Sequence, residues 1–141
     1  MATGFVTGNG NRGARNAERG TRTAESLLDR TKALAIRVVK LVDALPAKRS
    51  CDAIGRQLIR SATSIGANYR AARRGRSPAE FCAKLGISEE EADETSYWLE
   101  LLVDSELVAA SKLESLRREV DEITAMIVSS IKTARRRRNA R

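Results

Sequence analysis

Apolar positions recur with the spacing of an amphipathic α-helix in four separate stretches of the chain. In the first stretch, residues 27–45, they recur in alternating steps of four and three, and Pro46 ends the pattern because the residue before a proline is disfavoured in a helix. The second stretch, residues 54–69, follows Ser50, a residue type that caps helix N-termini. Both stretches therefore predict helices that bury one face.

The third and fourth stretches each begin with the signature of a capping box. Ser77 is followed by Pro78 and Glu80, which predicts a capping serine, a proline at the first helical position and a carboxylate that closes the box. Ser111 and Glu114 repeat the serine-to-glutamate spacing. The periodic apolar positions that follow occupy residues 81–102 and 113–131. Two further helices are predicted here.

Four amphipathic helices with short connections are typical of an antiparallel up-down-up-down four-helix bundle, which is the fold we predict. Small residues inside the second helix, such as Gly55 and Gly66, lower helix propensity and so indicate that another helix approaches closely. Further apolar residues lie off the main stripes: Leu28, Ala35, Ile36, Val39, Met126 and Val128. They predict self-association through a second buried face, unless they are scattered exposed residues.

The positive charge of the chain is concentrated at its two ends. The 141 residues contain 26 Lys and Arg against 18 Asp and Glu, a net charge of +8. Residues 1–22 hold four arginines and one acid, residues 132–141 hold six cations and no acid, and the segment between them carries a net charge of −1. We therefore divide the chain into a flexible basic arm (1–22), a four-helix bundle (23–131) and an arginine-rich tail (132–141).

The composition argues against an enzyme. The chain has no histidine, which excludes Ser-His-Asp triads and the usual zinc centres. Glu90 and Glu94 lie one helical turn apart, but a di-metal carboxylate bundle also needs Glu-x-x-His pairs. We predict no catalytic residue, no metal and no cofactor. Cys51 and Cys82 form no CxxC pattern, and the chain has neither a membrane-length apolar run nor a secretory signal, so we expect a cytoplasmic protein without a membrane role.

Charge is also segregated within the predicted bundle. Residues 56–76 contain six arginines and no acid, whereas residues 80–106 contain nine acids and one lysine. Two interpretations follow: the two helices neutralise each other, or the arginine-rich corner stays free to bind phosphate, which the planar guanidinium recognises well. In the first interpretation, Glu91 and Glu94 hold polar residues of the facing helix, namely Arg60, Ser64 or Asn68.

The last ten residues contain four consecutive arginines, which are suited to RNA, DNA or an acidic surface, or serve only as a solvated tail. Aromatic residues are only 4% of the chain, so any nucleic acid would be bound mainly through its phosphates. The candidate nucleic-acid-binding residues are Arg70, Arg73, Arg74, Arg76, Arg135, Arg136, Arg137 and Arg138.

Residues 57–102 resemble the core signature of the four-helix-bundle proteins related to those encoded in intervening sequences of bacterial 23S ribosomal RNA genes. The matching positions are Gln57, Arg60, Ser64, Ile65, Ala67, Asn68, Arg76, Ser77, Glu80, Phe81 and Glu94. The resemblance implies a homopentameric ring of largely uncharacterised function, suspected of binding RNA. It also implies structural or interface roles for the polar positions Arg60, Ser64, Asn68, Ser77, Glu80 and Glu94.

One similar protein, an accessory factor of diversity-generating retroelements, works with a reverse transcriptase and nucleic acid. The chain departs from the family after Asn68, where a glutamate is usual and Ala71 and Ala72 stand instead. We thus arrive at two hypotheses. The first is a non-enzymatic oligomer that binds RNA or DNA through arginines. The alternative is a protein-interaction scaffold or accessory subunit, for example of a reverse transcriptase, without a direct nucleic-acid role.

Overall fold

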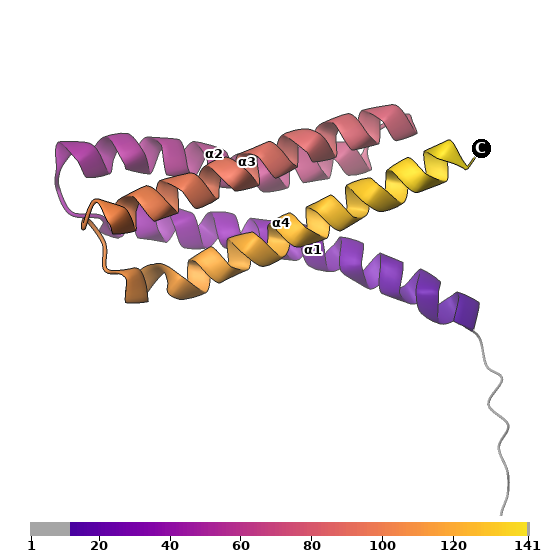
Figure 1. The fold of residues 1–141 in the computed structure, drawn as a ribbon, viewed down its shortest axis with the longest axis horizontal. Coiled ribbons are helices and arrows are strands. Elements are labelled where there is room, and N and C mark those ends of the chain that lie inside the picture. Colours follow the sequence, from indigo (N-terminus) through magenta and orange to yellow (C-terminus); the bar gives the residue numbers. More distant parts are fainter. Residues whose placement is uncertain (1–11, 141) are drawn as a thin grey trace, which may run out of the picture.

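The computed structural model describes the backbone of residues 12–140 and the side chains of residues 26–140. This part of the chain forms four helices and no strand: α1 (Arg12–Ala44), α2 (Arg49–Arg73), α3 (Pro78–Asp104) and α4 (Ala110–Asn139). Consecutive helices pack against each other, and α1 also contacts α4 (Figure 1). The all-α, four-helix prediction is confirmed.

The core is built from the stripes that the sequence periodicity predicts. Residues on each stripe are buried because steps of three and four place them on one helix face. The fully or nearly buried apolar members include Leu27, Leu34, Val38, Leu58, Ala62, Ile65, Tyr69, Leu85, Ala92, Leu99, Leu102, Leu113, Leu116, Val120, Ile123, Ile127 and Ile131. Cys51 and Cys82 are buried and unpaired, as small apolar residues would be.

Of the three predicted helix N-caps, the one at the start of α3 is correct. Ser77 is the N-cap residue, and its Oγ accepts a hydrogen bond of 3.1 Å from the backbone N–H of Glu80. The Glu80 carboxylate in turn accepts a bond of 3.0 Å from the backbone N–H of Arg76, one residue before the cap. The box is therefore closed, and it fixes the backbone at the connection between α2 and α3.

The predicted caps of α2 and α4 are wrong. The N-cap residues are Lys48 and Ala109, neither of which makes a side-chain cap, and Ser50 and Ser111 already lie in the first helical turns. Before α4, the backbone N–H groups of residues 107 and 108 both bond to the carbonyl of Leu102, so the end of α3 determines where the chain can turn. Tertiary placement of the connections has overridden the cap preference of serine.

Two helices extend beyond the predicted bundle boundaries. α1 begins at Arg12 rather than near Thr23, and α4 continues to Asn139, through all four consecutive arginines. The free energy needed to add each further residue to an existing helix is small, because the unfavourable nucleation step has already occurred in the packed segment. Residues 1–11 of the predicted arm lie outside the described residues.

α1 and α2 approach each other closely at two glycines. A Cβ added at Gly55 would lie 3.1 Å from Val42 Cγ1, and one added at Gly66 would lie 3.0 Å from Thr31 Oγ1 and 3.2 Å from Thr31 Cβ. Thr31 is 1% exposed, and its hydroxyl donates to the carbonyl of Leu28. The small residues of α2 therefore permit the close helix contact that the sequence indicates.

We expect alanine at Gly66 and alanine at Gly86 to have opposite effects on stability. Gly86, in α3, has nothing within 4 Å of an added Cβ, so Gly86→Ala should raise the free energy of unfolding by up to about 1 kcal/mol through helix propensity. Gly66→Ala gains the same propensity but must separate α1 from α2, and a net loss of about 1 kcal/mol is expected. Urea unfolding followed by circular dichroism measures both; changes of the same sign would contradict the close contact.

Contacts along neighbouring helices follow a consistent register. On α1 and α4, Arg30 reaches Glu119, whereas Arg37, further along α1, reaches Ser115, earlier on α4. α2 and α3 show the same opposite order of contacts: Thr95, later on α3, bonds Ser61, earlier on α2, whereas Ser88 bonds the carbonyl of residue 65. Consequently the end of α2, the start of α3 and the end of α4 lie at the same end of the molecule (Figure 1).

Candidate nucleic-acid interface

Eight exposed arginines from two segments of the chain lie at this end of the bundle. Four belong to the end of α2 and the connection after it, and four to the last turns of α4. They are the candidates that the sequence gives for nucleic-acid binding: Arg70, Arg73, Arg74, Arg76, Arg135, Arg136, Arg137 and Arg138. Within the described part of the chain, none of them forms an ion pair with a carboxylate. We call this set the basic end.

Helix geometry explains why so much positive charge is tolerated there. The last turn of α2 contains Arg70 and Arg73, and the last turn of α4 contains residues 136–138. Cations are favourable beside the partial negative charge of a helix C-terminus, by about 0.3–1 kcal/mol each. The arginines can therefore stabilise their helices while their guanidinium groups remain in solvent.

The two groups of arginines meet around a cleft. It has a volume of about 650 Å³, and it is lined by the connection between α2 and α3, by the first turn of α3 and by the end of α4. Arg76, Arg137 and Arg138 all line it. A second cleft, of about 310 Å³, is lined by Leu28 and by three arginines at the end of α2 and just after it: Arg70, Arg73 and Arg74. The structure thus brings Arg76 beside residues that follow it by about sixty positions in the chain.

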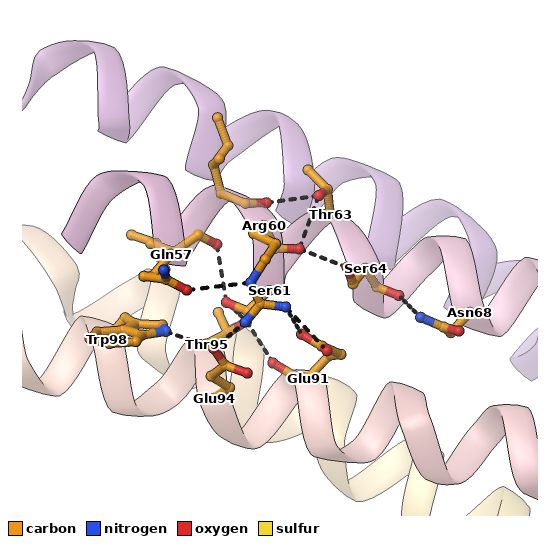
Figure 2. A network of polar contacts seen from close by, with 12 residues as sticks. Gln57, Arg60, Ser61, Thr63, Ser64, Asn68, Glu91, Glu94, Thr95 and Trp98 are labelled. Carbon is orange, nitrogen blue, oxygen red and sulfur yellow. Dashed lines mark hydrogen bonds and ion pairs between the residues drawn. The ribbon is translucent and has the colours of Figure 1, made fainter. Parts of the chain in front are cut away.

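Arg60, in contrast, is neutralised. Its Nη1 donates to both oxygens of Glu91, at 3.3 and 3.2 Å, and its Nη2 donates to Glu94 (Figure 2). Glu94 also accepts a bond of 3.2 Å from the indole of Trp98. The hydrogen bond from Arg60, and then that from Trp98, lowers the pKa of Glu94, and the same pairing raises the pKa of Arg60. The prediction that Glu91 and Glu94 hold Arg60 is confirmed.

The other two predicted partners of these carboxylates bond elsewhere. Ser64 Oγ donates to the carbonyl of residue 60, and Asn68 Nδ2 donates to the carbonyl of Ser64 (Figure 2). Both side chains find a backbone acceptor four residues earlier on their own helix, so they do not need a partner on α3. The two interpretations of the arginine-rich segment thus divide along α2: its middle is paired with α3, and its end is not.

A second arginine cluster, which the sequence did not reveal, joins α1 to α4. Arg30 donates from Nε and Nη2 to the two oxygens of Glu119, at 2.8 and 2.9 Å, and it also contacts Glu122 and the sulfur of Met126. The hydrogen bond from Arg30 lowers the pKa of Glu119, and the bonds to Glu119 and Glu122 raise the pKa of Arg30. The bidentate geometry makes this a structural link and leaves no free charge for a ligand.

The pairs formed by Glu94 and Glu119 should make the fold sensitive to acid. A carboxylate with a lowered pKa in the folded state stabilises the protein above its unfolded pKa of about 4.3, and this stabilisation is lost as the pH falls through the folded pKa. Glu119→Gln is expected to lower the free energy of unfolding by about 1 kcal/mol at pH 7 and by much less at pH 2.5. Urea titrations at both pH values measure this. An equal loss at both would show that the charge of Glu119 does not matter.

Other kinds of site find little support in the described residues. No group of three or more His, Cys, Asp or Glu side chains within residues 26–140 is placed to hold a metal ion. No described helix is long and apolar enough to cross a membrane. Of the aromatic residues, Tyr97 is 55% exposed and packs edge-on against Trp98, whereas Phe81 is half-buried and lines the larger cleft.

Comparisons with known proteins agree on one family. A family model described as 23S rRNA-intervening sequence protein matches residues 26–129. The chain is also similar to a crystallised protein of unknown function from the S23 ribosomal protein family of Bacteroides thetaiotaomicron. The two are 37% identical, the match covers 78% of this chain and 98% of the other, and the TM-score is 0.74. No curated protein sequence matches the chain.

Proposed function

Because the chain belongs to the 23S rRNA-intervening sequence protein family, we propose that it is a non-enzymatic, cytoplasmic protein that binds RNA through phosphate contacts at the basic end. One observation carries the proposal: eight exposed arginines, from the end of α2, the connection after it and the end of α4, lie at one end of the bundle, and none of them pairs with a carboxylate among the described residues. Arg30 and Arg60, in contrast, are held in ion pairs within the fold.

Phosphate is the ligand chemistry that this surface favours. Guanidinium groups bind phosphate with two parallel hydrogen bonds, and release of counterions from the strand supplies most of the free energy. Consecutive residues on a helix point about 100° apart, so residues 135–138 surround the end of α4 and only some of them face a given strand. We therefore estimate about six phosphate contacts per subunit.

Self-association would strengthen this binding. The contact register supports an antiparallel up-down-up-down bundle, and Ile36 and Val39 on α1 are 47% and 39% exposed. These apolar side chains, together with the ring that the family resemblance implies, support a homopentamer. Several basic ends in one assembly convert the second and later contacts into intramolecular events, which raises the overall affinity.

The salt dependence of RNA binding tests the proposal. With about six phosphates neutralised on a single strand, the logarithm of the association constant should fall with the logarithm of the salt concentration with a slope near −4. Fluorescence anisotropy of a labelled single-stranded RNA, between about 50 and 200 mM salt, measures this slope. Absence of binding at low salt would contradict the proposal and favour the alternative of a scaffold or accessory subunit.

A further inference from the structure

We propose that the cleft of about 650 Å³ at the basic end is a nucleotide subsite, which takes one phosphate and its base from a bound RNA strand. This proposal rests on the proposed function and adds to it a defined place for one nucleotide. The cleft volume falls within the range of about 300–1,000 Å³ that is typical of small-ligand sites.

The polar part of the cleft favours an anion. Its guanidinium groups come from two separate segments: Arg76 precedes α3, and Arg137 and Arg138 end α4. No carboxylate lines the cleft, and none pairs with these arginines among the described residues. Three unpaired guanidinium groups around one cavity repel each other, so a bound phosphate would relieve this repulsion as well as accept hydrogen bonds.

The start of α3 does not itself supply the anion site. Ser77 Oγ already accepts from the backbone N–H of Glu80, and the Glu80 carboxylate accepts from the backbone N–H of Arg76. These bonds instead fix the backbone that carries the cleft. We therefore assign phosphate recognition to the arginine side chains.

Apart from Ser77, the rest of the cleft is apolar, which distinguishes it from a simple phosphate site. Pro78, Phe81 and Ala134 line it together with Gly75. A Cβ at Gly75 would lie 3.0 Å from the carbonyl oxygen of Ala72 and 3.3 Å from the backbone nitrogen of Phe81, so the missing side chain lets the connection fold tightly against α3. An apolar wall with an aromatic ring, next to arginines, suits a planar base attached to a phosphate.

Two matched double variants test the position of the phosphate. Arg137→Ala/Arg138→Ala removes two charges that line the cleft, whereas Arg135→Ala/Arg136→Ala removes two charges from the same helix end that do not. With the full-length chain and a labelled single-stranded RNA ten-mer at 0.1 M salt, we expect the first variant to lose at least about fivefold more affinity than the second, since each phosphate contact contributes about fivefold there.

A third variant tests the base. Phe81→Leu keeps an apolar side chain but removes the ring, so we expect roughly tenfold weaker binding of the RNA ten-mer and unchanged binding of an abasic ten-mer with the same number of phosphates. Thermal unfolding of each variant establishes that it is folded. If Phe81→Leu does not fold, the comparison of the two double variants alone tests whether the cleft holds the phosphate.

The outcomes separate this proposal from the function on which it rests. Equal losses in the two double variants, or equal effects of Phe81→Leu on both ten-mers, would overturn the subsite while steep salt dependence still supports RNA binding at the basic end. Failure of the unmodified protein to bind either ten-mer at low salt would overturn both. A selective loss in Arg137→Ala/Arg138→Ala together with base-dependent loss in Phe81→Leu would establish the subsite.

Discussion

Replacement of seven arginines of the basic end by alanine is expected to weaken single-stranded RNA binding by roughly 10⁴-fold at 0.1 M salt. The replaced residues are Arg73, Arg74, Arg76, Arg135, Arg136, Arg137 and Arg138. The estimate follows from about six phosphate contacts, each of which contributes about fivefold at this salt concentration. The salt slope should fall from near −4 toward zero in the same measurement.

The chain offers a charge-matched control at its opposite end. Lys48 is the N-cap residue of α2, Arg49 begins the helix, and Lys112 lies in the first turn of α4; all three are exposed and form no ion pair within the described residues. Their replacement by alanine removes three charges at a distance where salt screens them, so affinity should change by less than about threefold. The variant Arg73→Ala/Arg74→Ala/Arg76→Ala removes the same charge and should lose roughly 100-fold. Equal losses would mean that net charge alone, and not the basic end, binds RNA.

Leucine at Ser88 is expected to be the most damaging single substitution in the bundle. Ser88 is fully buried on α3, and its hydroxyl donates to the carbonyl of Ile65 on α2, so the two helices nearly touch at this point. A larger side chain must push α2 away from α3, which should cost about 3 kcal/mol and lower the melting temperature by about 10 °C.

Alanine at the same position provides the control. Ser88→Ala keeps the small volume and loses one hydrogen bond, and the Ile65 carbonyl retains its helical acceptor role, so a cost of only about 1 kcal/mol is expected. Differential scanning calorimetry of both variants measures the difference. Similar melting temperatures for the two would show that the α2–α3 contact is not limited by side-chain volume.

Sequence periodicity predicted the core of this fold almost residue by residue, because burial of one helix face leaves a direct mark in the spacing of apolar residues. It also predicted the Arg60 pairing with Glu91 and Glu94, since oppositely charged segments on consecutive helices meet by necessity in a short-loop bundle. Helix ends were predicted less well. The preference of serine for N-cap positions predicted the correct cap at Ser77 but wrong caps at Ser50 and Ser111. At the last two, the packing of the connecting segments determines where the helix begins.

Two features that bring distant segments of the chain together could not be predicted from the sequence. The cluster of Arg30 with Glu119 and Glu122 depends on the register between α1 and α4, which periodicity does not determine. The cleft likewise requires that Arg76 and Arg137 meet, and only the folded bundle brings them together. The arginines of the basic end were predictable as candidates from the sequence, but the cleft that some of them share was not.

The indole of Trp98 has a practical consequence. It is the only tryptophan of the chain, it is half-buried, and its N–H is bonded to the carboxylate that Arg60 holds. Its fluorescence therefore reports directly on whether α2 and α3 remain joined at this network. Unlabelled protein can thus be followed optically during acid titration or helix separation, whereas RNA binding confined to the basic end should leave the emission of Trp98 unaltered.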